Sequence, residues 1–449
     1  MLKNYFTLAI KVLGRRKFFT FISLFGISFT LMILMLITAF FQTELGGDAP
    51  LGKKDQLVYL DYIETFKQYQ DTIPKVDSTM MDGVMQYDTT GFKYEDSGRS
   101  ISRGPGSIKF WTTHMEDVPF VKFRTIYTDY QSFDIFINSN KLTFSSTFTD
   151  GNFFDIYNFK FLAGKPFGNQ QLENQAQVVV LSQEACKKYF GINEGTFDEA
   201  IGKEITLDRK NYTVIGVIDR VNNSFGFLKS DVFIPYTNAA PEVLNRERFN
   251  GSFSATFLAE NASKTNNVKE ELVKRSKVIP LPNPEQHDQL EYFPATYTER
   301  YAWTMLRMDE PEKSYKYALG ALIFLLTLFF MLPTLNLINL NISRIMERSS
   351  EIGVRKAFGA HSGNILFQFV FENIVLTFIG GVIGFILAYL LLNTINGSNF
   401  LNGTILSFNY KVFIYSFLIC LGFGILSGFL PAWKMSRVHI VNAIKNNQL

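Results

Sequence analysis

The sequence contains few of the residues from which redox and metal sites are usually built. Cysteine occurs only twice in 449 residues, as Cys186 in a polar segment and Cys420 in an apolar run. We therefore expect no disulfide, and we expect Cys186 to be a small buried side chain rather than a reactive thiol. The four histidines are scattered, and no two of them have the spacing of metal ligands. These scarcities argue against a disulfide-stabilised domain and against a zinc site.

Recognisable catalytic motifs are also missing. The chain contains no GxSxG elbow and no HExxH helix. Gly202-Lys203 resembles the end of a phosphate-binding loop, but Glu204 follows where Ser or Thr is required. The acidic run at residues 309–312 could bind a cation, although a solvated charge run beside a membrane is the favoured interpretation. The sequence therefore predicts no catalytic site, no metal, no cofactor and no ATPase in this chain.

Charge is absent from four long apolar stretches, at residues 18–41, 317–340, 374–392 and 412–430. A helix needs about 20 apolar residues to cross the hydrocarbon core, and each stretch is close to this length. The first stretch is longer than the apolar region of a signal peptide, which favours an anchor. The predicted fold class is an α-helical membrane protein with four transmembrane helices and a large mixed α/β extracytoplasmic domain.

The distribution of Lys and Arg predicts the orientation in the membrane. Residues 1–17 and 432–449 contain basic residues and no acidic ones, and basic residues outnumber acidic ones at 343–363. In residues 43–316, by contrast, acidic residues are in excess. Because cytoplasmic segments are enriched in Lys and Arg, both termini and the 343–363 connector are predicted to be cytoplasmic.

These patterns predict the following organisation along the chain. A basic amphipathic helix (1–17) lies on the cytoplasmic leaflet and precedes transmembrane helix 1 (18–42). The extracytoplasmic domain (43–314) leads to transmembrane helix 2 (315–342) and the cytoplasmic connector (343–363). Transmembrane helix 3 (364–393), a short outer loop (394–410), transmembrane helix 4 (411–431) and a cytoplasmic tail (432–449) complete the chain. Glu372 is expected at the membrane interface in preference to a role as an ion relay.

Residue patterns in the extracytoplasmic segment are typical of a mixed α/β fold. Strands are predicted at 56–63, 121–128, 133–148 and 177–182, and a hairpin of 203–207 and 212–218 around a turn at 208–211. Helices are predicted at 183–190, ending at Gly191, and at 268–276. Residues 78–106 are rich in Gly, Asp and Ser and are predicted to form an insertion or a mobile loop.

The connector between the second and third apolar stretches contains the most informative motif. It reads Glu347-Arg348-Ser349-Ser350-Glu351-Ile352-Gly353-Val354-Arg355-Lys356-Ala357-Phe358-Gly359-Ala360. Acidic and basic residues fall at helical spacing and can pair at i,i+4, and Gly359 can end the helix. On spacing alone, a solvated loop that only satisfies the positive-inside rule remains the alternative.

This motif resembles the "ER..EIG.RKA.GA" signature of MacB/FtsX-type ABC transporter permeases. Gly380-Gly381, the Gly428 to Ala432 ending, and blocks such as residues 159–167 and 178–182 extend the resemblance. It implies a non-catalytic permease subunit of the bacterial inner membrane, driven by a separate ABC ATPase that would bind ATP and Mg. The coupling residues that the resemblance implies are Glu347, Arg348, Glu351, Ile352, Gly353, Arg355, Lys356 and Gly359.

Further partners follow from the same resemblance. It implies a second permease chain, identical or different, and allows a periplasmic or outer-membrane partner in addition to membrane lipids, but no nucleic acid. The expected activity is export or extraction of peptide, lipoprotein or drug-like substrates. An FtsX-like signalling subunit that controls cell-wall hydrolases is the main alternative, and a membrane-anchored adhesin or sensor is a third. Glycine pairs predict close helix packing, within the chain or in a dimer; they are Gly380 with Gly384, and Gly424 with Gly428.

Overall fold

The computed structural model describes residues 2–15, 17–47, 49–81, 84–129, 131–137, 140–192, 194–222, 225–281, 287–347, 354, 358–359, 361–398, 404–406 and 408–436. The chain forms two compact units. Met1–Gly46 together with Leu319–Leu449 form the helical unit, and Gly47–Ala318 form the α/β domain.

Long apolar helices build the helical unit, because a backbone surrounded by lipid must form its hydrogen bonds within each helix. They are α1 (Leu2–Arg15), α2 (Lys17–Leu45), α10 (Pro311–Glu347), α12 (Ser362–Gly397) and α13 (Tyr410–Ser436). Each of the four predicted apolar stretches lies inside one of the last four helices. Within the described residues, two helices are long and apolar enough to cross a membrane, Lys17–Leu45 and Leu366–Gly397. The count of four spans remains a prediction.

In the helical unit, α12 packs against α2 on one side and against α13 on another. An apolar cluster at the α1 end of this bundle includes Leu13, Leu31 and Leu376 from α1, α2 and α12. Ring contacts join α12 to α13, where the Phe385 and Phe413 centroids lie 4.9 Å apart. The bundle is therefore held together by apolar and aromatic side chains of sequence-distant helices.

The α/β domain is built on a mixed sheet of eleven strands. Its main path runs in the order β14-β1-β12-β4-β6-β11-β8-β10-β7, with β5 on β6 and β9 on β10. The β8–β10 and β6–β11 pairs are parallel, and the other pairs are antiparallel. The strands are β1 (Leu57–Leu60), β4 (Val121–Thr128), β5 (Gln131–Ile137), β6 (Asn140–Thr149), β7 (Phe161–Gly164), β8 (Val178–Ser182), β9 (Glu204–Leu207), β10 (Lys210–Ile218), β11 (Val232–Pro235), β12 (Phe253–Ala259) and β14 (Ala295–Thr296).

Short helices connect these strands, and local sequence signals set their ends. They are α3 (Ile108–His114), α4 (Phe153–Ile156), α5 (Asn169–Glu173), α6 (Gln183–Phe190), α7 (Pro241–Leu244), α8 (Thr265–Ser276) and α9 (Tyr297–Leu306). The Ser182 side chain caps α6 by accepting from the Ala185 N–H, and Gly191 ends it with φ of 69°. The strand predicted at 177–182 is therefore confirmed as β8, one residue shorter, and the predicted helix at 183–190 is confirmed as α6.

Of two further strand predictions, one is confirmed and one is wrong. The hairpin at 203–218 is confirmed, with Asp208 and Arg209 at positive φ in a two-residue turn between β9 and β10. The single strand predicted at 133–148 is wrong, because the chain turns back there and forms the antiparallel pair β5–β6. Both halves of this run are rich in strand-forming residues, so the composition did not reveal the turn between them.

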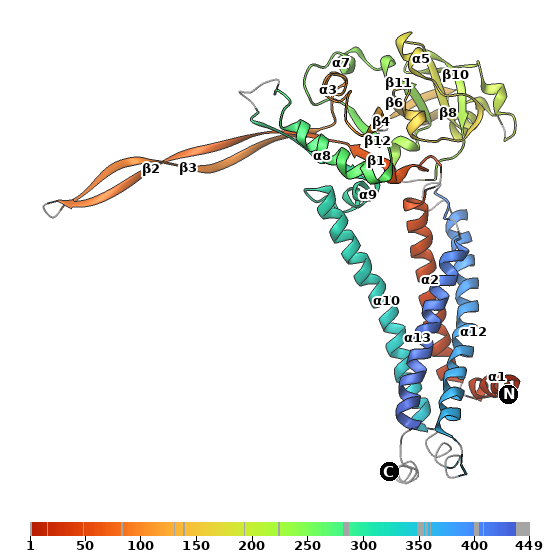
Figure 1. Ribbon diagram of the computed structural model, residues 1–449. Coiled ribbons are helices and arrows are strands. Elements are labelled where there is room, and N and C mark those ends of the chain that lie inside the picture. The colour runs from red at the N-terminus through yellow and green to blue at the C-terminus, as the bar shows by residue number, and fades with distance from the viewer. Residues whose placement is uncertain are drawn as a thin grey trace. The chain divides into compact units, whose positions relative to one another are not determined.

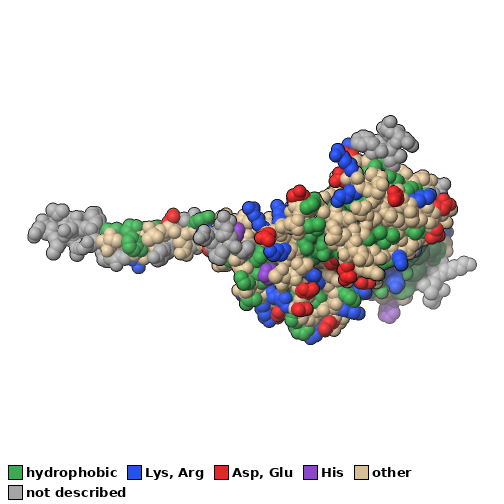
Figure 2. Space-filling view, turned by 90° about the horizontal axis from the view of Figure 1, so that it is seen from above, with side chains coloured by type: hydrophobic (Ala, Val, Ile, Leu, Met, Phe, Trp, Pro, Cys, Tyr) green, Lys and Arg blue, Asp and Glu red, His purple; other side chains and the backbone are tan. Residues whose placement is uncertain are grey.

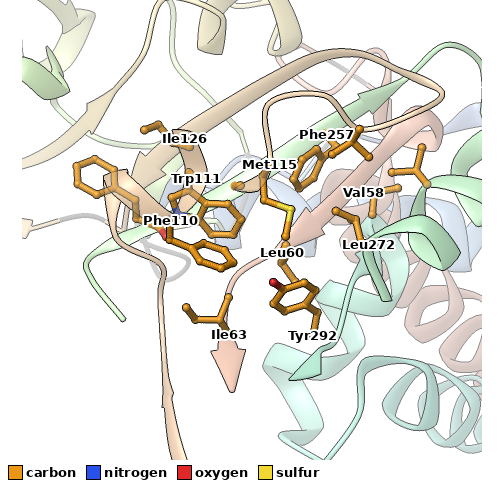
Figure 3. Close-up of a cluster of buried hydrophobic side chains, with 14 of the residues drawn as sticks. Val58, Leu60, Ile63, Phe110, Trp111, Met115, Ile126, Phe257, Leu272 and Tyr292 are labelled. Atoms are coloured by element: carbon orange, nitrogen blue, oxygen red, sulfur yellow. Dashed lines mark hydrogen bonds between the residues drawn. The ribbon is translucent and has the colours of Figure 1, made fainter. Parts of the chain in front are cut away.

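Two apolar cores stabilise the α/β domain. One lies between the β1, β4 and β12 strands and helices α3 and α8 and includes the fully buried Trp111 (Figure 3). The Trp111 indole N–H donates to the Phe253 carbonyl at 2.8 Å, so this large side chain is buried with its polar atom satisfied. The second core lies around β8, β10 and α6, and Phe148 packs against both cores.

A long two-stranded arm extends from this domain (Figure 1). It consists of β2 (Ile63–Met81) and β3 (Val84–Gly104), and β13 (Gln289–Tyr292) pairs with the root of β2. Residues 78–106 were predicted to be an insertion or a mobile loop, and the loop is wrong because most of this segment is β3. Gly and Asp disfavour strands only weakly, and cross-strand pairing with β2 overrides that preference.

Candidate coupling site and its supporting contacts

The candidate coupling site lies at one end of the helical unit. The first residues of α2 and α12 and the last residues of α10 and α13 lie at this end, together with α1 (Figure 1). The predicted coupling residues belong to the segment that joins α10 to α12. Glu347 is the last residue of α10, and Gly359 is described as well. Arg348, Glu351, Ile352, Gly353, Arg355 and Lys356 lie outside the described residues.

A backbone hydrogen bond joins two described residues of this segment. The Phe358 N–H donates to the Val354 carbonyl at 3.1 Å, the i,i+4 bond of an α-helix. Gly359 follows with φ of 87°, a conformation that favours glycine and commonly ends a helix. The sequence alone indicated this terminating glycine, and the backbone has the expected form at that position.

Phe358 is not among the coupling residues that the sequence predicted. The Phe358 side chain is 89% exposed and the Val354 side chain is 50% exposed, so these two residues present apolar surface. The sequence did contain one sign of this surface, a Phe close to Lys356 and Gly359. A single Phe beside basic residues in a polar connector has no apolar core in which to be buried. Phe358 is therefore an exposed aromatic side chain that follows the basic residues Arg355 and Lys356 in the sequence.

Helix α1 supports this end of the bundle. The predicted amphipathic helix is confirmed as a helix over Leu2–Arg15. Leu13 is buried against the bundle and its carbonyl accepts from the Thr20 hydroxyl at 2.9 Å, whereas Phe6 and Ile10 are about half exposed. Exposed apolar residues on a basic helix are typical of a helix that lies at a membrane surface.

A polar group near the same end of α12 is buried. The Gln368 side-chain amide donates to the Glu372 carboxyl at 2.9 Å, and Asn373 and Thr377 are buried nearby on the same helix. Glu372 is 8% exposed and lies inside the helix bundle. Whether this carboxylate lies at the level of the membrane interface, as predicted, stays untested.

The glycines of α12 pack within the chain. A Cβ atom at Gly380 would come within 2.8 Å of Ile27, and at Gly384 within 2.9 Å of the Ser28 carbonyl, both on α2. Both glycines therefore contact α2 of the same chain, and the choice between packing within the chain and in a dimer stays a prediction. Gly424 and Gly428 lie in α13, and their surroundings are outside the described part of the chain.

In the α/β domain, a buried ion pair joins α9 to the chain directly after β1. Arg300 Nε donates to Asp61 Oδ2 at 2.6 Å, and the guanidinium lies over the rings of Tyr59 and Phe225 at 4.5 Å. Burial raises the pKa of Asp61, although Arg300 opposes the shift. Burial alone would lower the pKa of Arg300, and the nearby Asp61 outweighs it and raises that pKa.

The rest of the α/β domain gives little sign of catalytic chemistry. Within the described residues, no group of three or more His, Cys, Asp or Glu side chains is arranged to hold a metal ion. Burial raises the pKa of the Cys186 thiol to about 11, and the residue is fully buried, which confirms the expected small apolar role.

Known proteins resemble this chain in both units. The MacB-like periplasmic core domain matches residues 20–275, and the FtsX-like permease C-terminal domain matches residues 323–440. The macrolide export ATP-binding/permease proteins MacB of Escherichia coli (strain K12) and Shigella flexneri are each 26% identical over 312 residues. These matches cover 68% of this chain but 44% of each relative, so the chain spans less than half of their length.

Solved structures give weaker matches. The periplasmic region of MacB from Actinobacillus actinomycetemcomitans has a TM-score of 0.35 at 17% identity, over 45% of this chain and 83% of that one. A domain of a putative permease from Porphyromonas gingivalis also has a TM-score of 0.35, at 16% identity, over 56% and 93%. The family match is extensive, since it covers more than half of the residues. The chain belongs to the family of permeases with a MacB-like periplasmic core domain and an FtsX-like C-terminal domain.

Proposed function

We propose that the chain is the membrane-spanning permease subunit of an ABC transporter complex. ATP hydrolysis would occur on a separate ATPase subunit, which would bind the ATP and Mg. The stroke would enter this chain at the segment between α10 and α12 and would move the α/β domain. The load would be a peptide, lipoprotein or drug-like compound that is exported or extracted.

The observation that carries this proposal is the exposure of Phe358 and Val354 within the permease signature. A groove on a soluble partner needs a protruding element, and an exposed aromatic residue on a helical turn is a common anchor. Glu351 and Arg355 of the same motif stand at i,i+4 and can stiffen the segment. A stiff connector would pass on a displacement that a flexible loop would absorb.

Helix α10 supplies a rigid route for this motion. It is continuous over 37 residues from Pro311 to Glu347. At about 1.5 Å per residue, its length is roughly 55 Å. Only a few residues separate its first turn from α9, which Arg300 fixes to Asp61. A push at Glu347 would thus reach the sheet of the α/β domain through hydrogen-bonded helix and one buried ion pair.

The proposed topology has four transmembrane helices in the bacterial inner membrane, with both termini cytoplasmic. The excess of Lys and Arg at 1–17, 343–363 and 432–449 supports it. A second permease chain would complete the complex, and a periplasmic or outer-membrane partner could receive the load. The FtsX-like match at 323–440 keeps one alternative open, in which the stroke controls a cell-wall hydrolase.

Charge reversal tests the coupling segment. The double variant Glu351→Arg/Arg355→Glu changes the surface that the ATPase would contact, and we expect the ATPase to be lost from the detergent-extracted complex. Copurification followed by mass spectrometry would measure the ratio of ATPase to permease. We expect at least a tenfold drop with unchanged membrane insertion, because several charge-assisted contacts would be lost together.

A matched control lies at the other end of α10. Glu312 and Lys316 also form an i,i+4 pair, at 2.8 Å, and both side chains are more than half exposed. Exchanging these two residues should leave ATPase binding unchanged. Equal ATPase recovery from both double variants would rule out the coupling assignment. Stimulation of ATP hydrolysis by a substrate would then indicate export, whereas activation of a cell-wall hydrolase would indicate signalling.

A further inference from the structure

The β2–β3 arm is long and largely unsupported. Strand β13 pairs with β2 only from Ile63 to Phe66. From Lys67 onward the described strand that pairs with β2 is β3, although the Gln68 N–H also donates to the Asp288 carboxylate at 2.9 Å. At about 3.3 Å per residue, the stretch from Lys67 to Met81 is roughly 50 Å long. A two-stranded hairpin is at best marginally stable in water. An arm of this length therefore calls for a surface that covers one of its faces.

The root of the arm is rigid. Arg103 donates to the buried Glu64 carboxylate at 2.9 Å, and Arg99 lies over the Phe66 ring at 3.4 Å. The Asn250 side chain also donates to the Ser102 hydroxyl at 2.7 Å. Because the root is fixed in this way, the arm leaves the α/β domain in a defined orientation of its two faces.

The strand register gives these two faces different chemistry, because residues paired across a ladder share a face. Between Thr72 and Met80 one face, here called the uncharged face, contains no Asp, Glu, Lys or Arg, and the next pair of that face toward the root is Gln70–Asp96. Its pairs are Thr72–Tyr94, Pro74–Phe92, Val76–Thr89, Ser78–Tyr87 and Met80–Met85. The other face contains four acidic and two basic residues. Its pairs over the same length are Asp71–Glu95, Ile73–Lys93, Lys75–Gly91, Asp77–Asp88 and Thr79–Gln86.

Apolar side chains of the uncharged face are exposed. Phe92 is 61% exposed and Val76 is 49% exposed, and Figure 2 shows hydrophobic side chains along the projecting arm. A large aromatic side chain and a Val at adjacent pairs of one face would normally be buried. This strip is narrow, only as wide as two strands.

The edges of the arm are unsuited to strand addition. Pro74 lies in the middle of β2 and has no N–H for a new neighbour. The register shifts between Tyr69 and Gln70 and again between Lys75 and Val76, which leaves one extra residue of β3 at each place. Bulges of this kind twist an edge away from further pairing. A partner would therefore bind the uncharged face and leave the edges free.

We infer that the uncharged face of the arm packs against the uncharged face of the same arm in a second copy of this chain. Two sheets pack face to face at about 10 Å, and a second ribbon matches this strip in width, length and lack of charge. In such a pair the charged faces stay in water. A lipid surface fits less well, because the opposite face has excess acid and membrane-bound elements are usually basic.

Cysteine cross-linking in membranes that contain the full-length chain tests this contact. Val76→Cys and Phe92→Cys place a thiol on the uncharged face, and Lys75→Cys and Lys93→Cys place one on the charged face one residue away. Cys186 is fully buried, so the added thiol is the accessible one in this domain. With a short bis-maleimide, we expect covalent dimers at several-fold higher yield from Val76→Cys and Phe92→Cys.

A second substitution separates contact from chance collision. Phe92→Asp in the Val76→Cys background should reduce the dimer yield at least fivefold, because it buries an unpaired charge in the interface. Equal yields from the two faces would overturn the inference. So would a cross-linked product of a different mass, or thiols on the uncharged face that are protected from labelling without forming a dimer. None of these readouts depends on ATPase binding, so they remain valid if the coupling proposal fails.

Discussion

At the scale of single residues, the α/β domain contains polar groups whose burial has measurable consequences. Asp150 is 7% exposed at the end of β6, where it accepts from the Thr125 hydroxyl at 2.6 Å and from the Ile126 N–H at 3.1 Å. Burial raises the pKa of this carboxyl to about 6, and these hydrogen bonds only partly oppose the shift.

The pH dependence of stability should reveal Asp150. Because the native state binds the Asp150 proton more tightly than the unfolded chain, its contribution is greatest below about pH 4 and is lost as the pH rises through about 6. The size is roughly 3 kcal/mol. We expect Asp150→Asn to remove this part of the pH dependence in urea unfolding of residues 47–310. Parallel curves for the two proteins between pH 4 and 7 would contradict the assignment.

The Asp61–Arg300 pair should matter more for stability than an exposed pair. Arg300→Ala would leave the Asp61 carboxyl buried without its counter-charge, and we expect the α/β domain to lose about 3–5 kcal/mol in unfolding free energy. The exposed pair Lys109–Glu247, with an N–O distance of 3.1 Å, is the control. Lys109→Ala should change stability by less than about 1 kcal/mol. A similar small loss from both variants would show that the buried pair is not critical.

At the scale of elements, the contact between α12 and α2 depends on the missing side chains of Gly380 and Gly384. Such a contact brings two backbones close enough for van der Waals packing, which is the main force between helices in lipid. Gly320 of α10 does not allow a close contact of this kind, because a Cβ atom there would meet nothing within 4 Å.

Two glycine substitutions should therefore act in opposite directions. Gly384→Ala must displace the Ser28 carbonyl or Leu31, and we expect a loss of about 1–3 kcal/mol and a lower melting temperature in detergent. Gly320→Ala should be neutral or stabilise by about 0.5–1 kcal/mol, because alanine favours the helix. A stabilising effect of Gly384→Ala would mean that α12 and α2 are not in close contact.

At the scale of the whole molecule, the orientation of the helices decides the proposed mechanism. The excess of Lys and Arg at 343–363 predicts that the segment around Gly353 faces the cytoplasm and that Ser398 faces outward. In intact spheroplasts, we expect a membrane-impermeant maleimide to label Ser398→Cys and to leave Gly353→Cys unlabelled. Permeabilisation should then expose Gly353→Cys. Labelling of Gly353→Cys in sealed cells would exclude the proposed topology and the ATPase contact with it.

Local sequence signals predicted much of the α/β domain. The buried strand Val178–Ser182, its capped helix and Gly191 could be identified because each signal lies within a few residues of its effect. The arm could not, because β3 is a strand only through its pairing with β2 across the tip. Phe358 was also missed, since exposure depends on what the rest of the chain fails to cover.

The sequence by itself determined the apolar helices and the permease signature, because hydrophobic length acts through composition. It also predicts the orientation of the helices, through the Lys/Arg balance. Only the tertiary structure decided which helix the α12 glycines touch, that Arg300 reaches Asp61, and that β2 and β3 form an arm with one face uncharged from Thr72 to Met80. Each of these depends on contacts between residues far apart in the chain, and spacing along a sequence does not specify which distant surfaces meet.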